Sequence, residues 1–284
     1  MARPPRIEYP NALYHVTSRG KDRQDIFTDN ADRQQWLEIF ASVCNRMKWR
    51  CYGYCLMDSH YHIIIETPLA NLAQGMRQLN GVYTQKTNFR HQRSGQIYQG
   101  RYKAIIFDKE KYLLEVCRHV ALNPVRAGLV AKSQDWEWSS HPATSGKAEV
   151  PEWLHPKTVL TILSTNIPLA QSAYRSFVRQ GINLSNLWDN VRNQIYLGDE
   201  NFVRATQARI NKETRGKKTP NQQNRLTQDP LTTYRDNFTD KQEAVAHAFL
   251  DGHHTMKEIG DFFDIHYSTV SRWVKRFEEK HRES

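Results

Sequence analysis

One stretch decides the fold of this chain: Asp58-Ser59-His60-Tyr61-His62-Ile63-Ile64-Ile65-Glu66. Its isoleucine run predicts a buried strand, and Asp58-Ser59 predicts the turn that leads into it. Side chains alternate between the two faces of a strand, so His60 and His62 point one way and Tyr61 points the other. The stretch therefore predicts a sheet with two imidazole rings side by side on one face.

Two neutral imidazoles placed in this way form half of a site for a divalent metal ion. The alternative is a pair of ordinary surface histidines beside a buried strand. The spacing of His60 and His62 leaves both interpretations open.

The segments on either side of the histidine strand alternate between strand and helix patterns. Strands are predicted at 12–19, 50–57, 60–67 and 96–107, and helices at 29–47, 72–89 and 109–122. The resulting order is typical of the α+β ferredoxin-like fold, an antiparallel sheet with helices on one face. We expect the histidine strand to be central in the sheet and Asn123-Pro124 to end the last helix.

The charge of the chain favours an anionic partner. The 284 residues carry a net charge of +10, and 39% of them are hydrophobic, which is ample for a packed core. Residues 85–111 hold seven Lys or Arg against two Asp or Glu, and residues 204–225 hold seven against one. Such basic clusters suit nucleic acid, although each is also compatible with a solvated surface or a loose tail.

Aromatic residues lie among the charges of the first basic cluster, a mixture that suits stacking on unpaired bases beside a phosphate track. In and just beyond this region the residues expected to contact DNA are Arg93, Tyr98, Arg101, Lys103 and Arg126.

The remainder of the chain divides by composition. Residues 1–130 form the predicted core domain, 131–203 a mostly helical extension and 204–240 a polar, basic linker. Residues 241–284 regain helical periodicity, with helices predicted at 241–250, 255–263 and 267–278 and a capping box between Thr255 and Glu258.

The spacing of the last two predicted helices is that of a helix-turn-helix. Inward-facing and outward-facing positions separate cleanly on the third helix, and the outward set predicted to contact duplex DNA is Ser268, Thr269, Ser271, Arg272 and Lys275. A generic three-helix bundle that binds another protein is the alternative, because residues 241–284 hold seven Lys or Arg against eight Asp or Glu.

The four cysteines show no zinc-ligand spacing. Cys51 and Cys55 share one face of a predicted strand and are expected in the core. With no signal-like or membrane-spanning apolar run, we expect no membrane association and a bacterial, nucleoid-associated location in the cytoplasm.

Four blocks in order resemble the single-tyrosine HUH transposases, specifically the REP-associated tyrosine transposase branch. They are Tyr14-His15-Val16-Thr17-Ser18-Arg19-Gly20, Met57 to Glu66, Ser94 to Lys103, and Leu122-Asn123-Pro124-Val125-Arg126-Ala127-Gly128. The resemblance covers residues 8–130, and a C-terminal helix-turn-helix is similar to that of some members of the wider group.

The resemblance implies cleavage of single-stranded DNA beside a hairpin. The pair His60 and His62 would hold Mg or Mn, with Asn123 as a further ligand, and the metal would make the scissile phosphate more electrophilic. A tyrosine would then attack, leaving a 5′-phosphotyrosine and a free 3′-OH. The family is typically dimeric, so a homodimer is also implied.

The chain departs from the family where the nucleophile is expected, because His119 stands at the tyrosine position four residues before Asn123. Three explanations are open. Tyr112, two helical turns earlier, is the nucleophile; or His119 ligates metal or activates water in a nuclease without a covalent intermediate; or cleavage has been lost and DNA recognition retained. Tyr112 is also compatible with simple packing on the sheet, and Asn123 with a helix cap.

The sequence thus predicts a transposase-like protein that recognises hairpin or single-stranded DNA through its core and duplex DNA through its C-terminal helices. The alternatives are a catalytically silent DNA-binding or transcription-regulating protein, or a C-terminal bundle that binds protein while only the core binds DNA.

Overall fold

The computed structural model describes residues 7–184, 187–192, 194–214, 230–250, 254 and 256–280. The chain divides into two compact units, residues 1–211 and 212–284. The first is built on a mixed sheet, and the described part of the second is helical.

The sheet of the first unit confirms the predicted element order. Its strands are β1 (Ala12–Arg19), β2 (Arg50–Leu56), β3 (His60–Thr67), β4 (Lys103–Phe107) and β5 (Tyr196–Leu197). They lie in the order β2-β3-β1-β4-β5, in which the first four are antiparallel neighbours and β5 pairs parallel with β4. The histidine strand β3 is therefore interior, as expected. The parallel strand β5 was not predicted.

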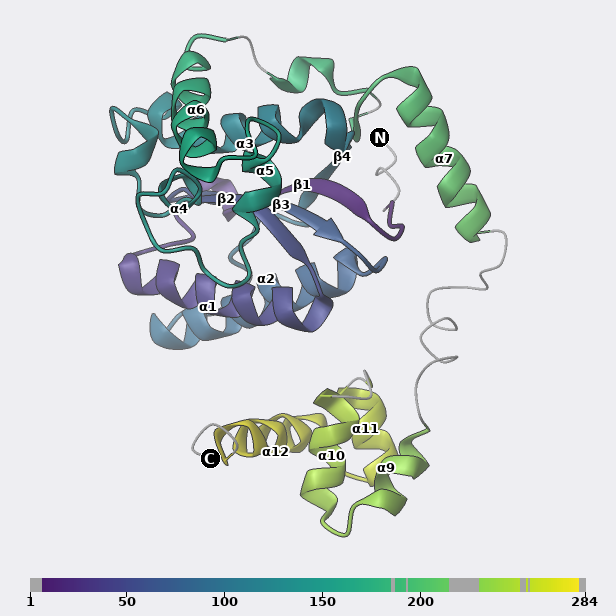
Figure 1. The fold of residues 1–284 in the computed structure, drawn as a ribbon. Helices are drawn as coiled ribbons and strands as arrows, with labels where there is room; N and C mark the ends of the chain where they lie inside the picture. Colours follow the sequence, from purple (N-terminus) through teal and green to yellow (C-terminus); the bar gives the residue numbers. More distant parts are fainter. Residues whose placement is uncertain are drawn as a thin grey trace. The chain divides into compact units, whose positions relative to one another are not determined.

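Helices cover both faces of this sheet rather than one. Helices α1 (Asn30–Met47) and α2 (Leu72–Arg90) lie on one side, and α3 (Lys109–Arg126) lies on the other with α5 (Pro156–Leu160) and α6 (Ile167–Gln180) (Figure 1). The sequence of β3 explains the difference, because Ile63 and Ile65 enter the first core while Ile64 enters the second. A strand with two apolar faces needs a cover on each.

The fourth strand is shorter than its predicted range of 96–107. Residues 96–102 form only an isolated bridge between Gly20 and Tyr98 before β4 begins at Lys103. Gly95 and Gly100 have φ of +95° and +68°, outside the region that a regular strand uses. These two glycines therefore make residues 91–102 a loop, which we call the basic segment.

Helix α3 runs through Pro124 instead of ending before it. Pro124 has no N–H to donate to the carbonyl of Val120 four residues earlier. The side-chain Nδ2 of Asn123 donates to that carbonyl at 3.3 Å and to the carbonyl of His119 at 3.0 Å. The asparagine amide thus replaces the missing backbone donor, and the helix ends before Gly128, whose φ is +72°.

A β-bulge in β2 separates two cysteines that the sequence places on one face. The pairing of β2 with β3 shifts between Cys51 and Gly53, which inserts one extra residue. As a result Cys51 packs in the core under α1 and α2, whereas Cys55 packs in the core under α3. Both are buried and free, as expected for core residues.

The region after α3, predicted as mostly helical, contains helices separated by long stretches of turns and irregular backbone. It adds a short α4 (His141–Thr144) to α5 and α6, and after β5 the chain enters α7 (Glu200–Thr214). Helix α7 and α9 (Leu231–Asn237) extend into the predicted 204–240 linker from its two ends, and residues 215–229 lie outside the described residues. None of the described helices is long and apolar enough to span a bilayer.

The second unit packs α9 with α10 (Lys241–Leu250), α11 (Met256–Phe263) and α12 (Tyr267–Lys280) around one apolar core. Val245, Ile259, Val270 and Val274 lie at its centre. The tight turn between α11 and α12 requires Gly260, because a Cβ there would stand 2.7 Å from the carbonyl oxygen of Ile265. Thr255, half of the predicted capping box, falls outside the described residues.

Candidate functional site

The two histidines of β3 lie on the same face of the sheet, as their spacing predicts. Their ring centroids are 5.0 Å apart and nearly perpendicular. His62 is buried, with 8% of its surface exposed, and His60 is half-buried at the start of the strand. We call the side of the sheet that carries these rings the histidine face; it is the side covered by α3.

A third histidine completes the row. His15 comes from the neighbouring strand β1, and its Nε2 lies 2.9 Å from Nδ1 of His62. The two ring planes are nearly parallel, 14° apart, with ring centroids 5.2 Å apart, and the short nitrogen–nitrogen distance is that of a hydrogen bond. No pattern in the sequence marks His15 as part of this row, because nothing in it says which residues of the two strands are paired.

The row of rings leaves two buried nitrogens without a hydrogen-bond partner, Nδ1 of His15 and Nε2 of His62. Burial lowers the pKa of His15 to about 3, with a further contribution from His119. Burial, then His15, His60 and His119, hold the pKa of His62 well below its usual value. Both rings are therefore neutral at neutral pH, the form in which imidazole binds metal ions.

His119 faces the same row from α3 but is held by other partners. Its ring centroid is 6.4 Å from that of His15 and 6.5 Å from that of His62. Trp188 donates its indole N–H to Nε2 of His119 at 2.8 Å, and Nη1 of Arg126 lies 3.1 Å from Nδ1. Burial and the charge of Arg126 lower the pKa of His119 to about 4.

Trp188 covers this part of the histidine face. Its indole stacks on His15 with ring centroids 4.4 Å apart and planes 12° apart. An indole N–H only donates, so Nε2 of His119 must carry a lone pair in this arrangement. No local motif in the sequence marks Trp188, which lies in a short 3₁₀ turn 69 residues beyond His119.

The other two predicted active-site residues lie differently. Tyr112 is half-buried and packs against the core between α3 and the sheet. Asn123 uses its amide nitrogen within α3, as described above. Across the described ranges, no group of three or more His, Cys, Asp or Glu is placed to hold a metal ion.

The basic segment after α2 is joined to the strand end that carries His60. Arg19 stands opposite His60 in the ladder between β1 and β3. Its Nε donates to the side chain of Gln99 at 2.7 Å, and its carbonyl accepts from the backbone N–H of Gln99 at 2.8 Å. The basic segment is therefore bonded to the sheet at the edge of the histidine face.

Most of the predicted DNA contacts in this region are exposed. Arg93, Arg101 and Lys103 project from the surface, and Arg126 donates to the carbonyl of Gly181 besides contacting His119. Tyr98 is different: it is only 6% exposed and packs in the core under α1 and α2. Its phenol ring is a core element rather than a surface for base stacking, which corrects the sequence expectation.

The predicted recognition surface of α12 is on the outside of the second unit. Ser268, Ser271, Arg272 and Lys275 are exposed and Thr269 is half-buried. Nη2 of Arg272 donates to the hydroxyl of Thr269 at 3.1 Å, and Nζ of Lys275 lies 3.6 Å from a carboxylate oxygen of Glu279.

Comparison with known families finds one matching model in each of the two compact units. Residues 8–121 match the family model "Transposase IS200 like", and residues 240–282 match "Helix-turn-helix domain". No curated protein matches the chain.

Two similar solved structures are a REP-associated tyrosine transposase bound to a REP hairpin and a transposase-like protein of Deinococcus radiodurans R1. The first is 17% identical, with 53% of this chain and 89% of that one covered and a TM-score of 0.46. The second is 13% identical, with 42% and 95% covered and a TM-score of 0.31. The two family models therefore show a likeness to IS200-like transposases in residues 8–121 and to helix-turn-helix domains in residues 240–282.

Proposed function

We propose that this protein recognises DNA through two surfaces and does not carry out tyrosine strand transfer. The transposase-like domain binds a hairpin and its single-stranded flank, and the helix-turn-helix binds duplex DNA. The observation that supports the first surface most is the bonding of the basic segment to the strand end of His60 through Arg19 and Gln99. Phosphates bound by that segment would lie at the edge of the histidine face.

The loss of strand transfer is inferred from the position that the family tyrosine should occupy. His119 stands there, with its two ring nitrogens in contact with Trp188 and Arg126. Tyr112 lies two helical turns away, about 10 Å along the helix axis, and packs against the core. Neither side chain is arranged as an attacking nucleophile.

The histidine pair nevertheless retains the chemistry of a metal site. Nε2 of His62 is a buried nitrogen without a hydrogen-bond partner, as expected for an atom that coordinates a metal ion. His60 and His62 would hold Mg or Mn, and DNA phosphate oxygens would complete the coordination. Such an ion supplies positive charge to the phosphate and makes its phosphorus more electrophilic. A second candidate function, a metal-dependent nuclease without a covalent intermediate, is favoured by the same orphaned nitrogen.

One assay separates these functions. Full-length protein is incubated with a hairpin oligonucleotide carrying a single-stranded flank, in Mn²⁺ or in EDTA. Retention, cleavage and covalent adduct are scored together. Recognition without strand transfer predicts retention that falls steeply with salt and no adduct on a denaturing gel.

The other results discriminate equally clearly. An adduct that disappears in Tyr112→Phe would contradict the proposal and restore tyrosine chemistry. Mn-dependent cleavage without an adduct would establish the nuclease. Failure of the protein to retain any DNA would exclude both DNA recognition and the nuclease. For the second surface, Arg272→Ala should weaken binding to duplex DNA, and unchanged affinity would remove α12 from recognition.

His15 should control how well the histidine pair binds metal. Its hydrogen bond to Nδ1 of His62 orients that ring, and losing such a partner usually weakens metal binding by about 10- to 100-fold. His15→Leu should show this loss by calorimetric titration with Mn²⁺. His15→Gln, whose amide can reach the same nitrogen, should stay close to the wild type. Equal losses in the two variants would mean that His15 only fills space.

A further inference from the structure

We propose that Phe89 is a platform on which an unpaired DNA base stacks. The inference rests on the proposed DNA-binding function and assigns one contact within it. Phe89 lies in the last turn of α2, and 89% of its surface is exposed. Within the described residues it is the most exposed of the large hydrophobic side chains, followed by Leu169 at 63%.

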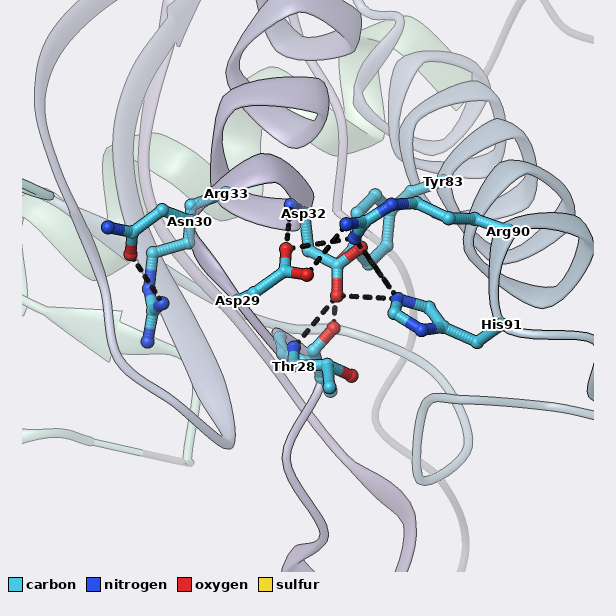
Figure 2. Close-up of polar contacts among 9 residues, drawn as sticks. Thr28, Asp29, Asn30, Asp32, Arg33, Tyr83, Arg90 and His91 are labelled. Carbon is cyan, nitrogen blue, oxygen red and sulfur yellow. Dashed lines mark hydrogen bonds and ion pairs between the residues drawn. The ribbon is translucent and has the colours of Figure 1, made fainter.

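The helix end that carries Phe89 is fixed in place by an ion-pair cluster (Figure 2). Arg90, the next residue, reaches carboxylate oxygens of Asp29 at 2.6 Å and Asp32 at 2.5 Å. Nε2 of His91 lies 2.9 Å from both carboxylate oxygens of Asp32. These contacts tie the C-terminal end of α2 to the N-terminal turn of α1, so the ring of Phe89 is presented from a rigid base.

The loop that follows is attached to the same turn. Nδ2 of Asn88 donates to the carbonyl of Gly95 at 2.8 Å, and the backbone N–H of Arg93 donates to the carbonyl of Asn88 at 3.0 Å. Phe89 therefore stands where helix and loop meet, and neither folds over its ring. An aromatic ring held out in water in this way loses the stabilisation that burial would provide.

The charge of the sequence segment that contains Phe89 indicates which kind of partner the ring binds. Residues 86–103 contain five Lys or Arg and no Asp or Glu. Arg90 is paired with Asp29 and Asp32, which leaves Lys86, Arg93, Arg101 and Lys103 on this segment. A solvated aromatic ring on a segment that also carries these cations matches the combination of stacking platform and phosphate track by which proteins bind single strands.

The unpaired base is favoured over a base pair because the faces of paired bases are already covered by their neighbours in a duplex. The bonds of Arg19 to Gln99 connect the far end of this loop to the strand end of His60. A single strand could thus follow the loop from the histidine face toward the end of α2.

The test compares full-length Phe89→Ala and Phe89→Trp with the wild type. The ligand is a hairpin with a single-stranded flank in which successive bases are replaced by the fluorescent base 2-aminopurine. Loss of one stacked base should weaken binding by about 5- to 100-fold in Phe89→Ala. It should also abolish the quenching of one flank position, and Phe89→Trp should restore both signals.

Leu169→Ala is the matched control, since Leu169 is exposed on α6 in a stretch, 164–174, without Lys or Arg. It should bind like the wild type. Phe89→Ala with unchanged affinity and quenching would overturn the stacking proposal while leaving DNA binding intact. Equal weakening on a blunt duplex without a flank would also overturn it. A wild-type protein that binds none of these DNAs would overturn the proposed function itself.

Discussion

The double variant His60→Ala/His62→Ala is expected to lose Mn²⁺ binding entirely. Within the described residues no group of three or more His, Cys, Asp or Glu is placed to hold a metal ion, so the pair would supply the only side-chain nitrogens proposed for the ion. The methyl group of alanine has no lone pair and cannot replace an imidazole as a ligand. Isothermal titration of the full-length protein with Mn²⁺, before and after substitution, measures the effect directly.

A matched control variant tests whether the loss of Mn²⁺ binding is specific to His60 and His62. His155 is exposed at the start of α5, and His155→Ala should leave the Mn²⁺ titration unchanged. If the double variant bound Mn²⁺ as tightly as the wild type, His60 and His62 would not be the metal ligands. Binding of the hairpin in EDTA would still report separately on DNA recognition.

The variant Asp32→Ala is expected to lower the free energy of unfolding by about 3 kcal/mol. The side chain of Asp32 is fully buried and accepts from Arg90, from His91 and from the backbone N–H of Thr28. Its removal takes this acceptor from the backbone N–H of Thr28 and from the ring of His91, and leaves Arg90 with Asp29 as its carboxylate partner. Arg90 is 36% exposed, so water recovers part of the cost and the loss stays below that of a fully enclosed pair. Urea denaturation measures it.

The loss of unfolding free energy in Asp32→Ala should also depend on pH. Burial alone would raise the pKa of Asp32, but hydrogen bonds from His91, Thr28 and Arg90 outweigh it and the pKa is lowered. A carboxylate whose pKa is lower in the folded state stabilises that state above its unfolded pKa of about 3.9, and the contribution disappears as the pH falls through the folded value. The stability gap between wild type and Asp32→Ala should therefore narrow below about pH 4.

The exposed Asp25 offers the comparison. Asp25→Ala should change the free energy of unfolding by no more than about 0.5 kcal/mol. A similar loss in both variants would show that any acidic residue of this region matters equally, and the buried cluster would have no special role.

Local patterns predicted the parts of the fold that depend on local chemistry. Strands β1 and β3 begin and end where alternation and flanking residues place them. The errors arise where a side chain or a glycine changes the backbone. Asn123 supplies a donor that lets α3 continue through proline, and the bulge at Cys51–Gly53 sends Cys55 to the opposite face. Neither effect leaves a periodic trace.

The histidine site could likewise be predicted only in part from the sequence. The spacing of His60 and His62 within one strand is enough to put them on one face. The partnership of His15 with His62, and of Trp188 with His119, joins residues 47 and 69 positions apart. Such contacts depend on strand pairing and on the path of the helical extension, which the sequence does not encode locally.

The strand β5 has a consequence for how this molecule can be dissected. It covers the outer edge of β4 through backbone bonds from Ile106 to Ile195 and from Asp108 to Leu197. A fragment cut at residue 121 or 130 would leave that edge bare, and the core under α3 would lose Tyr174 and Val178. Bare sheet edges recruit other chains and promote aggregation. The smallest piece that can be purified with an intact sheet should extend to the end of the first compact unit, at residue 211.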